Sequence, residues 1–108
     1  MSERAWRVFK IDELARSVEG NEPRFVEFLR NPKLSCAVYR LPAGAKDLQA
    51  PHLEDEIYFV ISGRAKLKIA GKDRDVTAGD ILYVRATTEH TFFEIEEDLT
   101  LIAIFGAA

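Results

Sequence analysis

The spacing of apolar and polar positions near the N-terminus predicts one short helix over residues 11–18. Its apolar residues repeat at helical intervals and fall on one face: Ile11, Leu14, Ala15 and Val18. Asp12 has the short acceptor side chain that caps helix N-termini, so we expect it to cap this one. A turn over residues 19–24 (EGNEPR) then separates the helix from the rest of the chain.

After this turn the period of the pattern changes, and short apolar runs rich in β-branched and aromatic residues predict strands. These runs lie at residues 24–30, 34–41, 56–62, 64–69, 73–76, 81–84, 91–95 and 99–105. Gly63 is expected to end one strand. Polar and apolar residues alternate over 64–69, which indicates that one face of this strand is exposed to solvent. The apolar strands suggest that both faces of the sheet are at least partly covered. Many short strands separated by frequent turns are typical of a β-sandwich or barrel.

Composition narrows the class of protein. With 108 residues the chain is expected to form one domain, and 47% apolar and 31% charged residues are typical of a soluble globular protein. No apolar run reaches the roughly 18 residues that a membrane span needs. The net charge of -3 and the scattered basic residues argue against a nucleic-acid partner. The single cysteine, Cys36, is expected to be buried and cannot form an internal disulfide. Because the N-terminus also lacks the apolar stretch of a secretory signal, we expect a cytoplasmic protein.

The chain has two histidines, and one of them, His52, lies four residues before Glu56. In an extended strand these side chains would be separated by roughly 13 Å, too far to share one metal ion. A helix would bring them together, but the run that follows, IYFVIS, favours a strand. We therefore place His52 at a strand end, a bend at 53–55, and Glu56 at the start of the next strand. The alternative is a solvated loop histidine with no ligand role.

The arrangement of these residues resembles two motifs of the cupin superfamily. Proteins of this superfamily fold as small double-stranded β-helix barrels. His52, Glu56 and Gly63 fit the H-x3-E-x6-G part of the first motif, and Gly79 and His90 keep the spacing of the second. The hairpin-like stretch between the motifs also resembles the family. Both histidines of the chain therefore fall on ligand positions of the motifs.

This resemblance covers about residues 34–105 and implies an all-β fold, a jelly-roll barrel with a short N-terminal helix. It divides the chain into an N-terminal extension at 1–30 and a cupin barrel at 31–108. It also implies a homodimer, since small cupins often pair through edge strands. The extension is rich in large apolar residues that could cover the outer face of the barrel or of a neighbouring subunit: Trp6, Phe9, Phe25 and Phe28.

The resemblance further implies that His52, Glu56 and His90 bind one divalent metal ion. Two imidazoles and one carboxylate resemble the facial triad of non-haem iron enzymes, and the same set suits zinc, nickel or manganese. The position of the family's first histidine is Ala50 here, so either the neighbouring Gln49 or water would fill that coordination position. The alternative is a degenerate cupin whose barrel is empty or binds an organic ligand directly.

Strand alternation predicts which side chains lie beside the metal. If Glu56 points inward, so does Tyr58, and if His90 points inward, so does Phe92. These aromatics would line a small, largely apolar pocket, although for Phe92 we favour a role in the core. Two further residues are candidates whose facing the sequence does not fix: Tyr39 and Tyr83.

The function implied is a metal-dependent cupin that acts on, or binds, a small organic molecule, with chemistry of the dioxygenase or isomerase type. Catalytic residues beyond the metal ligands are not identified. The alternatives are a non-catalytic module that binds or senses a small ligand and a structural remnant, because one fold serves many functions.

Overall fold

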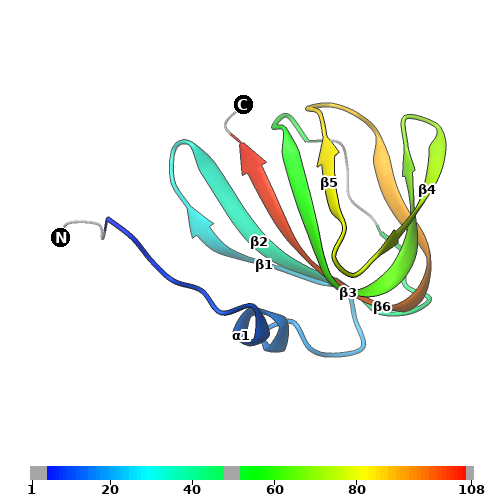
Figure 1. Ribbon diagram of the computed structural model, residues 1–108, viewed down its shortest axis with the longest axis horizontal. Helices are drawn as coiled ribbons and strands as arrows, with labels where there is room; N and C mark the ends of the chain where they lie inside the picture. The colour runs from blue at the N-terminus through cyan, green and yellow to red at the C-terminus, as the bar shows by residue number, and fades with distance from the viewer. Residues whose placement is uncertain (1–4, 48–51, 107–108) are drawn as a thin grey trace.

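The computed structural model of the chain describes residues 5–47 and 52–106, and they form an all-β fold with one short helix, as predicted (Figure 1). The elements in chain order are α1 (Ile11–Arg16), β1 (Arg24–Arg30), β2 (Leu34–Leu41), β3 (Glu56–Ile69), β4 (Lys72–Thr77), β5 (Ile81–Val84) and β6 (His90–Gly106). No helix in these two ranges is long and apolar enough to cross a membrane.

All strand pairs are antiparallel, and the sheet order is β1-β2-β6-β3-β4, with β5 also paired to β3. Strand β3 pairs with β6 along one edge. Its other edge is shared, because β5 pairs with residues 56–59 and β4 pairs with residues 64–69. The sheet curls strongly, so that β4 and β5 lie to the right of β3 in this view (Figure 1).

The two longest strands differ from the prediction. Gly63 does not end a strand but lies inside β3, and residues 91–95 and 99–105 belong to the single strand β6. At Gly63 φ is +99°, and a Cβ atom there would lie 2.7 Å from the Cα of Leu99 on the neighbouring strand. The β3–β6 register shifts three times between Val60 and Lys66, which is the signature of bulges. A glycine in a strand pattern therefore marks a bend here, not a strand end.

The core lies on the concave face of the curled sheet. Along β3 the side chains of Tyr58, Val60, Ala65 and Leu67 are buried, and apolar residues of β2, β5 and β6 join them. The predicted alternation over 64–69 is present, since Ala65 and Leu67 are buried while Lys66 between them is more exposed. These inward-facing positions make the interior largely apolar.

The opposite face of β3 is partly covered, as expected, whereas that of β5 is mostly open. Ile57 and Phe59 of β3 are 41% and 38% exposed, and Ile81 and Tyr83 of β5 are 69% and 60% exposed. Ile57 pairs with Tyr83 and Phe59 pairs with Ile81, so the four side chains are direct neighbours. We call these four residues the outer β3–β5 patch.

The N-terminal helix is shorter than predicted and has a different cap. It starts after Lys10, which makes no side-chain cap hydrogen bond. Asp12 lies within the first turn, and its Oδ2 is 3.5 Å from Nη1 of Arg16 in an exposed ion pair. The predicted capping role of Asp12 is therefore wrong. Preceding the helix, the ring of Phe9 packs edge-on against Phe28 of β1 with centroids 4.8 Å apart, so this segment does contact the sheet.

Candidate metal centre

The bend predicted between His52 and Glu56 is present. The chain bends at 53–54, and Glu56 is the first residue of β3. Two N–H groups of the loop at 86–87 hold this bend, one donating to the His52 carbonyl at 2.7 Å and the other to the Asp55 carboxylate at 2.8 Å. The loop before β6 therefore fixes the loop before β3.

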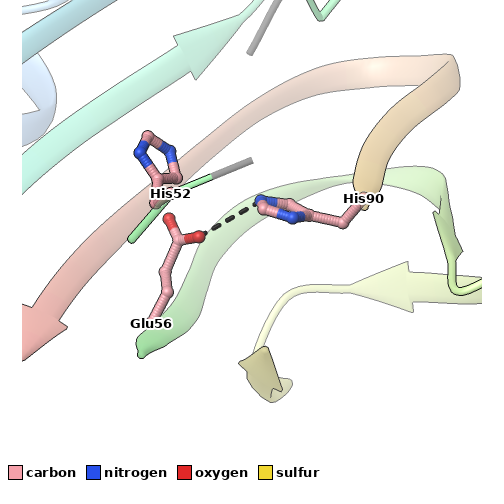
Figure 2. A group of neighbouring side chains, drawn as sticks. All are labelled: His52, Glu56 and His90. Atoms are coloured by element: carbon pink, nitrogen blue, oxygen red, sulfur yellow. Dashed lines mark ion pairs between the residues drawn. The ribbon is translucent and has the colours of Figure 1, made fainter. Parts of the chain in front are cut away.

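This bend brings three potential ligands together. His52, Glu56 and His90 each offer one ligand atom, and these atoms lie within 4.8 Å of one another. Figure 2 shows the Glu56 carboxylate between the two imidazole rings, with its Oε1 3.1 Å from Nε2 of His90. His52 comes from the loop, Glu56 from the start of β3 and His90 from the start of β6, so separate segments build the cluster.

Glu56 is the most unusual member of the cluster electrostatically. The side chains of Glu56 and His90 are each 1% exposed. The 3.1 Å separation is that of an ion pair, but neither carboxylate oxygen of Glu56 has a partner with hydrogen-bond geometry among the described residues. A buried carboxylate costs several kcal/mol unless it is paired, hydrogen-bonded or coordinated to a cation. The site therefore provides a buried negative charge that a protonated His90 or a bound cation would balance.

The imidazole of His90 is oriented by its other nitrogen. Nδ1 lies 2.9 Å from the carbonyl oxygen of Thr88, and a carbonyl can only accept, so Nδ1 carries a proton. In the neutral ring the lone pair is then on Nε2, as in metal-ligating histidines whose other nitrogen donates to a backbone carbonyl. The nearby Glu56 carboxylate raises the pKa of His90 above its ordinary value of 6.5.

Tyr58 contacts the cluster through its hydroxyl group. Its hydroxyl oxygen lies 3.0 Å from Nε2 of His90, and its side chain is fully buried. Its ring packs edge-on against the ring of Phe92, with centroids 5.2 Å apart. Phe92 itself is 1% exposed and belongs to the core, which is the role we favoured for it.

The structure also reveals a buried carboxylate that we did not predict. Asp47 is 8% exposed, and its Oδ1 accepts a hydrogen bond from the Tyr39 hydroxyl at 2.8 Å while its Oδ2 accepts one from the Phe92 N–H at 2.9 Å. Burial and the Asp47 charge raise the pKa of Tyr39, which keeps the phenol protonated. Asp47 follows a turn and matches no motif, so nothing in the sequence distinguishes it from a surface aspartate.

One candidate residue, Tyr83, does not join the site. Tyr83 is 60% exposed on the outer β3–β5 patch, because it pairs with outward-facing Ile57 while Glu56 and Tyr58 face inward. The sequence left its facing open, and in the structure it does not line the barrel interior. Gln49, the proposed fourth ligand, lies outside the described residues, as does the neighbouring Ala50.

A pocket of about 440 Å³ opens beside the cluster, and His52 forms part of its wall. Its apolar side includes Phe25 and Phe105, and the ring of Phe105 packs edge-on against the His52 ring with centroids 4.8 Å apart. Its polar side includes Glu27 and Arg30, which form a two-point ion pair. This volume is in the range of small-molecule sites.

Comparison with known proteins gives the same assignment of fold. The family described as "Cupin domain" matches residues 37–105. An uncharacterised protein of Streptomyces coelicolor is 38% identical over 100 residues, which is 93% of this chain and 95% of that protein.

Solved structures are similar over most of the chain. KdgF from Halomonas sp. has a TM-score of 0.72 and 23% identity, covering 84% of this chain and 83% of that one. An RmlC-like cupin with a double-stranded β-helix fold from Methanocaldococcus jannaschii has a TM-score of 0.76 and 16% identity, covering 99% of this chain and 93% of that one. At these identities the likeness concerns the fold alone.

Proposed function

The chain belongs to the cupin family, and we propose that it is a metal-dependent cupin that binds a small organic molecule in its barrel and acts on it. His52, Glu56 and His90 would hold one divalent ion. The observation that carries this proposal is the Glu56 carboxylate, buried between two imidazoles with no hydrogen-bond partner for either oxygen among the described residues. A divalent cation at that point would supply the missing partner.

The donor set suits a metal. Neutral imidazole nitrogen and carboxylate oxygen are ligands that iron, zinc, nickel and manganese all accept, and three protein ligands leave coordination positions open. The Thr88 carbonyl holds His90 in the tautomer that presents Nε2. An ion bound here would supply Lewis acidity, and a redox-active metal would in addition permit oxygen chemistry. The proposed reaction is therefore of the isomerase or dioxygenase type.

The surrounding residues support the binding of a small molecule. The pocket lined by His52 combines an aromatic wall, Phe25 and Phe105, with the charged pair Glu27–Arg30. The apolar interior excludes water from the buried side of Glu56, which strengthens every electrostatic interaction made there. Tyr58 presents a hydroxyl beside the ligand nitrogen of His90.

Metal analysis after purification tests the proposal. We expect about one divalent ion per chain in the wild type, and its loss in the His52→Ala, His90→Ala double variant and in Glu56→Ala. Glu54→Ala is the matched control, because Glu54 lies two residues away without joining the cluster, and it should keep the ion. Retention of metal by the double variant, or no uptake of added zinc, nickel, manganese or iron by the wild type, would contradict the site.

A second measurement separates the proposed reaction classes. Oxygen uptake by the iron-loaded protein during a substrate screen would indicate a dioxygenase, and turnover with zinc but without oxygen would indicate an isomerase. Binding of a small molecule without turnover under either condition would favour the alternative, a module that binds or senses its ligand.

We also propose a homodimer formed through the outer β3–β5 patch. Four adjacent large apolar side chains are more than a monomer usually leaves open on one sheet face. Light scattering is expected to give a dimer for the wild type and a monomer for Ile81→Glu. Val8→Glu introduces the same charge at a residue that is 74% exposed and lies outside the patch, so it should remain dimeric. A wild-type monomer would refute this proposal.

A further inference from the structure

The loop that precedes β6 contacts both histidines of the cluster through its backbone. The Thr87 N–H donates to the carbonyl oxygen of His52 at 2.7 Å, and the Thr88 carbonyl accepts a hydrogen bond from Nδ1 of His90 at 2.9 Å. Thr87 has a φ of +64°, in the left-handed region that residues with a side chain rarely adopt. Strain of this kind persists only where the surrounding contacts hold it, and it is concentrated at functional sites. This loop therefore sets the position of one histidine relative to the other.

Asp55 connects the same loop to the third residue of the cluster. Its Oδ1 accepts a hydrogen bond from the Ala86 N–H at 2.8 Å, and its carbonyl oxygen accepts one from the Gly106 N–H at 2.9 Å. The next residue is Glu56, the first of β3. Asp55 therefore joins the bend before β3 to the loop before β6 and to the end of β6. Because Asp55 is exposed, its side chain can be replaced without disturbing the core.

His52 is the member of the cluster that depends most on these contacts. Glu56 and His90 are buried and belong to strands, whereas His52 is half-buried and lies outside the strands, at the bend before β3. A ligand that has to be ordered when an ion binds lowers the affinity by the cost of that ordering. A bend that is already held in the binding conformation avoids this cost. The hydrogen bonds that hold the bend are therefore expected to raise the affinity for the ion.

We propose that Asp55 is a positioning residue of the metal centre. Through its hydrogen bond to the Ala86 N–H it keeps the bend before β3 in the conformation that places His52 beside the other two ligands. This inference rests on the proposed metal site, although Asp55 is not one of the clustered ligand residues. Asp55 acts as a hydrogen-bond acceptor and not through its charge, which is exposed and screened by salt. Asparagine should therefore be able to replace it, and alanine should not.

The first test measures Zn²⁺ binding by calorimetry at physiological ionic strength. Asp55→Ala removes the acceptor and should bind Zn²⁺ about three- to tenfold more weakly than the wild type. Asp55→Asn keeps an acceptor oxygen at the same position and should bind Zn²⁺ as the wild type does. Equal weakening in the two variants would overturn the inference, because it would show that the charge of Asp55 acts and not the hydrogen bond.

Asp80→Ala is the matched control for a general loss of stability. Oδ2 of Asp80 accepts a hydrogen bond from the Thr77 N–H at 2.9 Å, so this variant loses the same kind of exposed bond from the turn between β4 and β5. Both alanine variants should unfold at a lower temperature, but only Asp55→Ala should lose zinc affinity. Wild-type zinc affinity in Asp55→Ala, or an equal loss in Asp80→Ala, overturns this inference alone. Absence of zinc binding by the wild type overturns it together with the proposed function.

The second test follows hydrogen exchange by NMR in the metal-free protein, so it observes the positioning without any ion. The Thr87 amide proton reports the contact with the His52 carbonyl. It should exchange about three- to tenfold faster in Asp55→Ala than in the wild type, because the bend opens more often once the bond to Ala86 is lost. Asp55→Asn and Asp80→Ala should exchange this proton at the wild-type rate. An unchanged rate in Asp55→Ala would refute the positioning role, since the bend would then be held without this contact.

Discussion

Replacing Glu56 by glutamine should separate the role of this residue in metal binding from its effect on stability. The side chain is 1% exposed, and neither carboxylate oxygen has a hydrogen-bond partner among the described residues. The neutral amide has nearly the same shape and loses the buried charge. Removing an unsatisfied buried charged group is worth about 1–3 kcal/mol. The metal-free Glu56→Gln variant should therefore be more stable than the wild type where His90 is neutral.

The sign of this effect depends on pH. The Glu56 carboxylate raises the pKa of His90 above 6.5, so the charged pair stabilises the wild type fully below that value. This contribution is lost as the pH rises through the raised pKa, because the imidazole then becomes neutral and leaves the carboxylate unpaired. The advantage of Glu56→Gln should therefore be greatest in alkaline solution. It should shrink, or reverse, as the pH falls through the pKa of His90.

Thermal unfolding with a chelator present, followed by circular dichroism across this pH range, measures the difference. For a chain of this size 1 kcal/mol corresponds to about 4 °C in the melting temperature. Added Zn²⁺ should then raise the melting temperature of the wild type and leave that of Glu56→Gln unchanged. Glu22→Gln makes the same chemical change in an exposed loop and should match the wild type. Equal destabilisation of Glu56→Gln at every pH would refute the reasoning, since it would indicate a structural hydrogen bond.

Three further measurements test other parts of the structure. Gly63→Ala should lower the free energy of unfolding, measured in urea, by about 4 kcal/mol or more, since its Cβ would lie 2.7 Å from the Cα of Leu99. Gly79→Ala, with open space around it, should lower that free energy by about 1–3 kcal/mol. Equal losses in the two variants would contradict the close approach at Gly63. Burial raises the pKa of Cys36, so its reaction with a thiol reagent should be slow in the folded protein and fast in denaturant, and equal rates would contradict its burial. Zinc affinity should fall on acidification from a pH above 6.5, because protons compete at His90, and a flat calorimetric profile would exclude it as a ligand.

The chemistry of the site was more predictable from the sequence than its surroundings. His52, Glu56 and the bend between them follow from the local spacing and the strand composition after Glu56. His90 followed from a motif with a fixed spacing. Asp47 could not be predicted, because it bonds both to Tyr39, eight residues away, and to Phe92, 45 residues away. Long-range contacts of this kind leave no local pattern.

The facing of Tyr83 was unpredictable for a different reason. Strand β5 has four residues, and all of them are apolar or aromatic: Ile81, Leu82, Tyr83 and Val84. Its sequence therefore shows no alternation of apolar and polar residues. Its facing is set by its register on β3, where Tyr83 pairs with Ile57. The residue types on the outer face, Ile81 and Tyr83, are ones that an inner face could equally carry. A one-residue change of register would have exchanged the two faces.

The bend within the long β3–β6 ribbon is what makes the site possible. In the ladder Glu56 pairs with Phe105 and His90 pairs with Ile69, at the other end of β3. A flat ribbon would separate those two ends by about 40 Å at the rise of an extended strand. In the structure Oε1 of Glu56 and Nε2 of His90 are 3.1 Å apart. The ribbon must therefore curl almost back on itself, and its register shifts and the positive φ of Gly63 fall where that curvature is needed. Gly63 is thus connected to the proposed metal centre through the shape of the sheet, although it contributes no ligand.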